Sequence, residues 1–538
     1  GSKTDSGKTV ASAPTQGNNT VTESSTQEPT EEPTEDTKIE IQADSLDALE
    51  EMVNKDVDNT VEALTKSYEK LKTEINTYNK YKANTKKVKA FYDEVLLSQQ
   101  KLTTKLREYA LAYAKMILAS GDDMYDKMDD LYDVIYDKAG DKVYADCMGK
   151  AFVMFQLGKK PLEEGMNILG AHIDSPRIDV KQNPLYEDSD MAYLDTHYYG
   201  GIKKYQWVTI PLAIHGTIAK KDGTVRDIII GEKEDDPVLV ISDLLIHLSQ
   251  QQIEKKAGVV VEGEGLDILV ATKPLTGDAE LEKEEKELVK AAVVQFLKEN
   301  LDMEEEDFLS AELEIVPAGK ARDCGLDRSM VIGYGQDDRV CAFTSLFAML
   351  ETENPERTSC CILVDKEEIG SVGATGMHSR FFEDYVAELM ALTEDGNPLK
   401  VRRALRNSYM LSSDVSAAFD PLYADAFEKK NTAYFGRGLV FNKFTGSRGK
   451  NNSNDANAEY IAKVRQVLDS NGVGFQTAEM GRVDLGGGGT IAYILGNYNM
   501  QVIDSGVAVL NMHAPWEIIS KADLYEAKCG YKAFLKDA

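Results

Sequence analysis

The chain has 538 residues, of which 42% are hydrophobic, so it is long enough to bury the cores of two or three domains. Its 61 Lys and Arg stand against 91 Asp and Glu, and the formal net charge of −30 argues against nucleic acid or an anionic lipid surface as a partner, because both attract a basic surface. No stretch approaches the roughly 20 apolar residues that span a bilayer, and the 6 cysteines show no zinc-finger spacing.

Residues 1–40 are rich in Thr, Ser, Glu, Gln and Pro, and they are too polar to offset the entropy of ordering, so we predict a disordered tether. The sequence begins Gly1-Ser2 without a Met. A residue pair left by cloning would explain this start, and so would export of a protein whose signal, together with a lipid-bearing Cys, has been removed. Such a tether is typical of bacterial surface proteins, so an extracellular or cell-surface location is slightly favoured over a cytoplasmic one.

Residues 41–120 have a helical pattern. Apolar side chains recur at alternating spacings of four and three from Val57 to Tyr78, and the rhythm resumes at Leu102 after a polar interruption around 82–87. This pattern predicts a long helical hairpin that packs or spaces and carries no chemistry.

From about residue 121 onward, short apolar strands such as 167–170 and 361–364 alternate with helical stretches such as 339–350 and 456–468. Such alternation predicts an α/β fold with a mostly parallel sheet flanked by helices. Cys360 and Cys361 lie in one apolar run and are expected to be buried in a strand. Binding sites in such sheets form at the carboxyl ends of the strands.

His172 and Asp174 follow an apolar strand in the run Gly-Ala-His-Ile-Asp-Ser-Pro. A metal-bound imidazole is usually oriented by a neighbouring carboxylate, which this spacing would supply. Taken alone, the motif is weak, and a capped turn is the better interpretation of it. The pair Asp337-Asp338, followed by Arg and a helix, can bridge two cations or can simply begin a helix, where carboxylates interact well with the dipole.

Glu367 and Glu368 end another apolar strand and enter a Gly-rich loop. One glutamate can ligate a metal while the other acts as a general base on metal-bound water. Asp414 and His513 also follow apolar positions, and each has a structural alternative, a helix cap for the aspartate and a satisfied core residue for the histidine. The conjunction of these residues at strand ends is what predicts a two-metal centre, and nitrogen and oxygen ligands suit zinc, with cobalt or manganese as substitutes.

The chain resembles the metallopeptidase family of aspartyl aminopeptidase and vacuolar aminopeptidase I, and its clostridial-type members most. The resemblance covers roughly residues 122–538, and the motifs occur in the family's order. They are GAHIDSPRIDVKQNPLYED, THYYGGIKKYQWVTIPLAIHG, VPAGKARDCGLDRS, GQDDRVCAF, DKEEIGSVGATGMHSRFF, SSDVSAAFDP, VDLGGGGTIAYI and VLNMHAPWE.

The resemblance implies a zinc-dependent aminopeptidase that acts on short peptides with a free amino end and uses two divalent ions. Asp337 would bridge both ions, Glu367 would be the general base for a metal-bridging hydroxide, and Asp174 would orient the first histidine. The five metal ligands implied are His172, Asp337, Glu368, Asp414 and His513.

The resemblance also implies a domain plan, with a catalytic domain at 121–189 and 319–538 and a dimerisation domain inserted at 190–318. A histidine of that insert reaches the neighbouring subunit's site in the family, and His247 matches its position; a core or interface role is the alternative. A homo-oligomer follows, a dimer or a dodecamer.

Three residues are expected to bind substrate. Gly487 and Gly488 lie in a tetraglycine that lacks the Lys-Ser/Thr of a phosphate-binding loop and suits close approach of backbone to substrate. Lys443 lies near where aspartate-preferring relatives place a basic side chain.

Two other functions remain open on the sequence. One is a metallohydrolase of the same architecture with a different reaction, such as a carboxypeptidase or a deacylase. The other is a non-catalytic surface scaffold on a retired peptidase fold, which the helical hairpin suggests but the complete ligand set opposes.

Overall fold

The computed structural model describes residues 140–276, 286–394, 396–448 and 451–538, together with Lys55. The chain divides into two compact units, 1–129 and 130–538, and all described residues except Lys55 belong to the second. The predicted tether and helical hairpin therefore lie outside the described residues, apart from Lys55, which is helical. Among the helices of the described ranges, none has the length and apolar character that crossing a bilayer requires.

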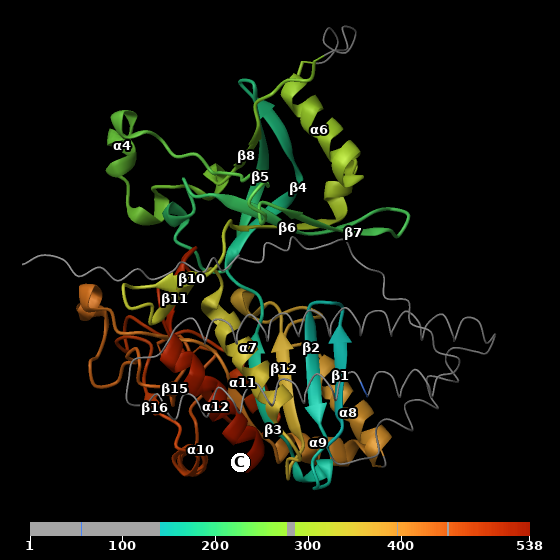
Figure 1. Cartoon of the computed structure of the whole chain (residues 1–538), viewed down its shortest axis with the longest axis vertical. Coiled ribbons are helices and arrows are strands. Elements are labelled where there is room, and N and C mark those ends of the chain that lie inside the picture. The colour runs from blue at the N-terminus through green and yellow to red at the C-terminus, as the bar shows by residue number, and fades with distance from the viewer. Residues whose placement is uncertain (1–54, 56–139, 277–285, 395, 449–450) are drawn as a thin grey trace, which may run out of the picture. The chain divides into compact units, whose positions relative to one another are not determined.

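An eight-stranded sheet forms the centre of this unit (Figure 1). Its four middle strands are parallel, as expected. Antiparallel pairings add two strands on one side and one strand on the other, and the last strand beyond that one is parallel to its neighbour. In order across the sheet, the strands are β1 (Lys142–Cys147), β2 (Ala151–Gln156), β12 (Ser359–Val364), β3 (Asn167–His172), β13 (Tyr409–Ser412), β17 (Gln501–Gly506), β15 (Leu439–Asn442) and β16 (Phe475–Thr477).

Both faces of this sheet are buried, because successive side chains of a strand point to opposite faces and each face meets helices. Ile168 of β3 packs in one core and its neighbour Leu169 in the other. The first core is completed by α8 (Phe381–Thr393), α9 (Pro398–Arg406) and α11 (Ala492–Gly496). The second is completed by α7 (Gln336–Glu351), α10 (Ala458–Asn471) and α12 (Lys521–Asp537). Cys360 and Cys361 are buried in β12, as predicted.

A five-stranded sheet holds two of the motif-bearing segments. Its strands, in order, are β10 (Arg322–Cys324), β11 (Met330–Gly333), β19 (Glu517–Ser520), β18 (Ala508–Leu510) and β14 (Ser416–Ala417). The chain leaves β11 to begin α7 with the Asp337-Asp338 pair, and it leaves β18 to reach His513. The sheet thus brings two segments far apart in sequence to one place.

A six-stranded antiparallel sheet is inserted between β3 and β10 and stands apart from the eight-stranded sheet (Figure 1). Its strands, in order, are β7 (Val225–Ile230), β6 (Leu212–Ala219), β9 (Ala311–Pro317), β4 (Arg177–Asp188), β5 (Met191–Tyr199) and β8 (Ile268–Ala271). The sheet has its own core, which includes the fully buried Trp207 and residues of α6 (Leu288–Leu301). The predicted insert, 190–318, begins later than this sheet, whose β4 starts at Arg177; the domain boundaries stay a prediction.

Candidate metal centre

His172 is the last residue of β3, and both of its ring nitrogens are engaged. Nε2 lies 3.1 Å from Asp337 Oδ1, and Nδ1 lies 2.9 Å from the backbone oxygen of Asp174. The ring is 2% exposed. If Nδ1–H donates to that carbonyl, the lone pair of Nε2 points toward Asp337 and can bind a cation there, which is the arrangement of a metal-binding histidine.

Asp174 links this histidine to the glutamate pair. Its Oδ1 accepts the backbone N–H of Glu367, and its Oδ2 accepts the backbone N–H of Glu368, both at 3.1 Å. Its Oδ2 also accepts the hydroxyl of Tyr199 at 2.8 Å. The carboxylate therefore holds the turn after β12 in place, which adds a second role to the orienting role that the sequence suggested.

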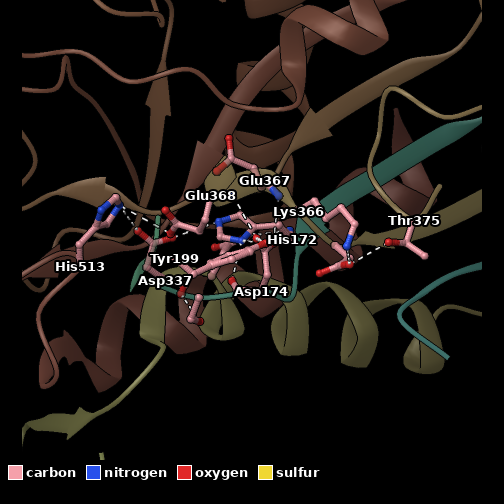
Figure 2. Close-up of polar contacts among 12 residues, drawn as sticks. His172, Asp174, Tyr199, Asp337, Lys366, Glu367, Glu368, Thr375 and His513 are labelled. Carbon is pink, nitrogen blue, oxygen red and sulfur yellow. Dashed lines mark hydrogen bonds and ion pairs between the residues drawn. The ribbon is translucent and has the colours of Figure 1, made fainter. Parts of the chain in front are cut away.

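Asp337 lies between the two predicted ligand histidines (Figure 2). Its Oδ1 faces His172, while its Oδ2 lies 3.3 Å from His513 Nε2. The same His513 nitrogen is 3.6 Å from Glu368 Oε1, and its Nδ1 lies 2.9 Å from the backbone oxygen of Gly201. Each oxygen of Asp337 thus meets a different histidine, a geometry that suits a carboxylate shared by two cations.

Three overlapping groups of side chains could each hold an ion, because their ligand atoms lie within 4.8 Å of one another. Two buried carboxylate oxygens in these groups, Glu368 Oε1 and Asp338 Oδ1, have no hydrogen-bond partner. Buried charged oxygens are normally satisfied, so they indicate room for a cation. The groups are His172 with Glu367 and Glu368, His172 with Asp338 and Asp414, and Asp337 with Glu368 and His513.

The crowding of carboxylates changes their ionisation in the metal-free chain. Burial, together with the charge of Asp337, raises the pKa of Glu368 to about 8, and burial also raises the pKa of Asp338 and of Asp414 well above the usual value. Burial alone would lower the pKa of His513, but its hydrogen bond to Asp337 and the charge of Glu368 raise it to about 10. Burial alone would also raise the pKa of Asp337, but hydrogen bonds and charge from His172 and His513 lower it. A divalent cation would favour the ionised form of the three acids whose pKa is raised, so the donor set fits such a metal.

Glu367 differs from the other acids in its placement. It begins η7 (Glu367–Ile369), and Figure 2 shows its carboxylate standing apart from the line of paired ligands. Burial and the charges of Asp337 and Asp174, opposed by His172, raise its pKa to about 7. A carboxylate with a pKa near neutrality can both accept and return a proton, which is what a general base requires.

Three residues of the centre received no individual role from the sequence, where Asp338 was considered only as one member of an acidic pair. Asp338 Oδ2 accepts the backbone N–H of His172 at 3.3 Å, and Tyr199 reaches Asp174 from the inserted sheet. Glu517, which is 1% exposed, accepts the backbone N–H of Asp337 at 3.0 Å and that of His513 at 2.7 Å. An acid four residues after His513 was the available signal for Glu517, and no signal pointed to Tyr199.

Asp414 follows β13 and also lines a cavity of about 500 Å³ with the glycines Gly487 and Gly488. A Cβ at Gly487, whose φ is +106°, would lie 2.3 Å from the Gly446 carbonyl oxygen, so only glycine allows this approach. Lys443 is not among the residues that line the cavity, since its ammonium pairs with Asp455 and lies 4.0 Å from the centroid of the Phe444 ring. The substrate roles of these three residues stay predictions.

His247 lies in η3 (Ile246–Leu248) of the insert, and its side chain is exposed. Among the described residues, it makes no hydrogen bond or ion pair with the centre. Its neighbours form an exposed apolar stretch: Leu244, Leu245, Ile246 and Leu248 are between 46% and 69% exposed. Within its own subunit, His247 therefore does not join the candidate ligands.

Comparison with known proteins gives the chain a family. Residues 113–535 match the family model of the aminopeptidase I zinc metalloproteases, M18. A probable M18 family aminopeptidase 1 from Clostridium acetobutylicum is 64% identical over 400 residues, which cover 74% of this chain and 85% of that protein. The crystal structure of aminopeptidase I from Clostridium acetobutylicum superposes with a TM-score of 0.70 at 62% identity, over 74% of this chain and 85% of that one.

These matches confirm the resemblance found in the sequence and the α/β fold, and they do not favour a scaffold or another metallohydrolase. The clustering of histidine and carboxylate side chains agrees with these matches, because the matching family is one of zinc metalloproteases. The chain therefore belongs to the M18 family of aminopeptidase I zinc metalloproteases.

Proposed function

We propose that this metallo-aminopeptidase removes the N-terminal residue of short peptides with two divalent cations, zinc first, held by the centre described above. The observation that carries the proposal is the position of Asp337, whose two oxygens face His172 and His513 separately. In this proposal Asp337 is shared, Asp414 joins His172 at one ion, and Glu368 joins His513 at the other. Cobalt or manganese would fit the same nitrogen and oxygen donors.

Two such ions, when bound, would supply Lewis acidity that polarises the scissile carbonyl and makes water a nucleophile at neutral pH. Glu367 would accept the proton of the attacking water and return it to the leaving amine, so that the proton balance closes within one turnover. His172 and His513 would keep their Nε2 atoms toward the reaction because carbonyls of Asp174 and Gly201 hold their Nδ1–H groups.

A homo-oligomer is proposed from the exposed apolar stretch around His247. The mApe1 of S. cerevisiae, a dodecamer, shares the fold with a TM-score of 0.58 at 21% identity, over 74% of this chain and 85% of that one. A second copy of the chain would cover the stretch and would bring His247 to the neighbouring centre, where it could stabilise the developing oxyanion. Export stays a prediction from residues 1–40, and the comparisons do not support the lipid anchor.

The test begins with a panel of aminoacyl chromogenic substrates that carry Asp, Glu, Leu, Met or Lys, each with a free and a blocked amine. Release that a chelator stops and zinc restores, from free-amine substrates alone, is expected; equal hydrolysis of blocked substrates would instead indicate a deacylase. An acidic preference would support the role of Lys443.

The variant Glu367→Gln tests the general base. We expect turnover to be lost while metal content stays near two ions per subunit, because the amide cannot accept the proton. Glu356→Gln, a change at an exposed residue paired with Lys159, is the matched control and should behave as the wild type. Unchanged turnover in Glu367→Gln would remove Glu367 from the mechanism.

A further inference from the structure

The segment that follows strand β5 of the inserted sheet lies against the candidate metal centre. Strand β5 ends at Tyr199, and the next two residues, Gly200 and Gly201, continue past the centre. We call residues 199–201 the insert strap. Each of the three residues lies against a different side chain of the centre, namely Asp174, Glu368 and His513 in turn.

Tyr199 acts on the centre through Asp174. The phenol is 9% exposed, and its hydroxyl donates to Asp174 Oδ2 at 2.8 Å. The same carboxylate accepts the backbone N–H groups of Glu367 and Glu368, and its Oδ1 lies 3.4 Å from His172 Nδ1. Within the part of the chain that the structure describes, Tyr199 is thus the one side chain of the inserted sheet that hydrogen-bonds this carboxylate. The carboxylate in turn supports two candidate ligands, His172 and Glu368, and the candidate base Glu367.

The phenol is itself held from the far side. Tyr199 and Arg177 are directly opposite one another on β5 and β4, and the guanidinium carbon lies 3.8 Å from the centroid of the Tyr199 ring. Arg177 is in turn fixed by Asp179 at 2.8 Å and Glu314 at 3.1 Å. The Tyr199 ring stacks on a guanidinium that two carboxylates hold in place, so the ring has little room to rotate. The inserted sheet therefore fixes the direction of the Tyr199 hydroxyl.

The two glycines let the backbone of the strap approach the remaining ligands. A Cβ at Gly200, whose φ is +73°, would lie 3.2 Å from Glu368 Oε2, and a Cβ at Gly201 would lie 3.3 Å from His513 Nδ1. Without these atoms, the Gly201 carbonyl comes within 2.9 Å of His513 Nδ1 and accepts its hydrogen. The strap therefore limits the space of Glu368 and sets the tautomer of His513.

We propose that the insert strap, with Tyr199 as its principal positioning residue, holds the ligands of the catalytic part in the geometry that binds the metals. The inserted sheet then serves the centre of its own subunit as well as any interface between subunits. The inference rests on the proposed function, because it presumes that the ligands bind divalent ions.

The experiment compares the zinc affinity of the metal-free full chain with that of Tyr199→Phe by competition with a chelator. Phe keeps the ring that Arg177 stacks on and removes only the hydroxyl. Loss of a supporting contact of this kind lowers metal affinity by about 10-fold or more, and that is the result expected. Cobalt loaded into the variant should show altered visible absorption, and kcat should fall with KM nearly unchanged.

Tyr186→Phe is the matched control, because Tyr186 lies in the same sheet and donates to a carboxylate, Asp267 Oδ2, at 2.5 Å. It should bind zinc as the wild type does. If Tyr199→Phe binds zinc with wild-type affinity and the wild-type cobalt spectrum, the inference is overturned even if its melting temperature falls. If the wild type itself binds no zinc, the proposed function fails first and this inference fails with it.

Discussion

Glu517 joins the two segments that bring Asp337 and His513 to the centre, and the variant Glu517→Gln isolates what that junction contributes. The two backbone N–H groups go to different oxygens, Oε2 for Asp337 and Oε1 for His513. Glutamine has one oxygen and one NH₂, so one of the N–H groups would face another donor. The change is nearly isosteric and leaves the packing of β19 intact.

The magnitude follows from these two hydrogen bonds. Bonds to a charged acceptor contribute about 1.5–3 kcal/mol each, and the amide would retain one neutral bond, so the net loss is about 2–3 kcal/mol. Since about 1.4 kcal/mol is a factor of ten, zinc affinity should fall by about 30–150-fold.

The loss should appear in zinc binding more than in the stability of the metal-free chain. Burial and the charge of Asp337 raise the pKa of Glu517 to about 8 when no cation is present, so at pH 7 the side chain is largely a neutral acid that glutamine imitates. A cation bound to Asp337 would offset the negative charge that raises the pKa of Glu517. The ionised Glu517 carboxylate could then accept both backbone N–H groups.

The assay is chelator competition at pH 7, with thermal unfolding of the metal-free proteins alongside it. Asp523→Asn is the matched control, because the buried Asp523 also accepts two backbone N–H groups, from Gly436 at 2.8 Å and Gly438 at 2.7 Å, one on each oxygen. Wild-type zinc affinity in Glu517→Gln would refute the reasoning. So would an equal loss in both variants, which would show a general structural effect.

Three further outcomes are expected. The metal-free chain should lose stability as the pH rises from about 5 to 8. An acid whose pKa is higher in the folded chain than in the unfolded chain contributes stability below its unfolded pKa, and this contribution is lost as the pH rises through its folded pKa. For Glu367, the rise in pKa from 4.5 to about 7 corresponds to about 3 kcal/mol of unfolding free energy. Calorimetry with and without zinc checks this, and a melting temperature that rises over the same range would contradict it. If His247 supplies the oxyanion donor of a partner subunit, His247→Phe should lower kcat by about 100-fold while zinc content stays intact. His197→Phe, a change at another exposed histidine of the insert, should leave kcat unchanged. Equal kcat values for the two variants would remove His247 from catalysis. Gly200→Ala should lower the unfolding free energy by about 1–2 kcal/mol because Gly200 has a positive φ, and it should also weaken zinc binding. Gly223→Ala is the control: its φ is also positive, but its Cβ would meet open space, so the change should affect stability alone.

Much of the fold and the core of the centre could be predicted because both depend on local signals. Runs such as Cys361 to Val364 are apolar throughout because the strand is covered on both faces, and histidines and acids stand out where such runs end. The central parallel strands bring those ends to one edge of the sheet, and His172 and Glu367 lie near one another there because β3 and β12 are neighbours. The candidate ligands could therefore be predicted from the sequence.

The supporting contacts could not be predicted in the same way. Glu517 and Asp337 are 180 residues apart, and Gly201 and His513 are 312 apart, so no spacing along the chain signals their pairing. Which of two adjacent acids faces a ligand, as with Asp338 and its bond to the His172 N–H, depends on the backbone of a single turn.

By itself, the sequence determined the α/β class, the strand ends and the residue types that bind metal, since hydrophobic pattern and side-chain chemistry are local properties. The tertiary structure alone decided that Tyr199 of an inserted sheet supports Asp174, and that Glu517 joins the segments of the candidate ligands Asp337 and His513. Such contacts depend on how separate sheets pack and in which register, and packing is settled by the whole folded chain.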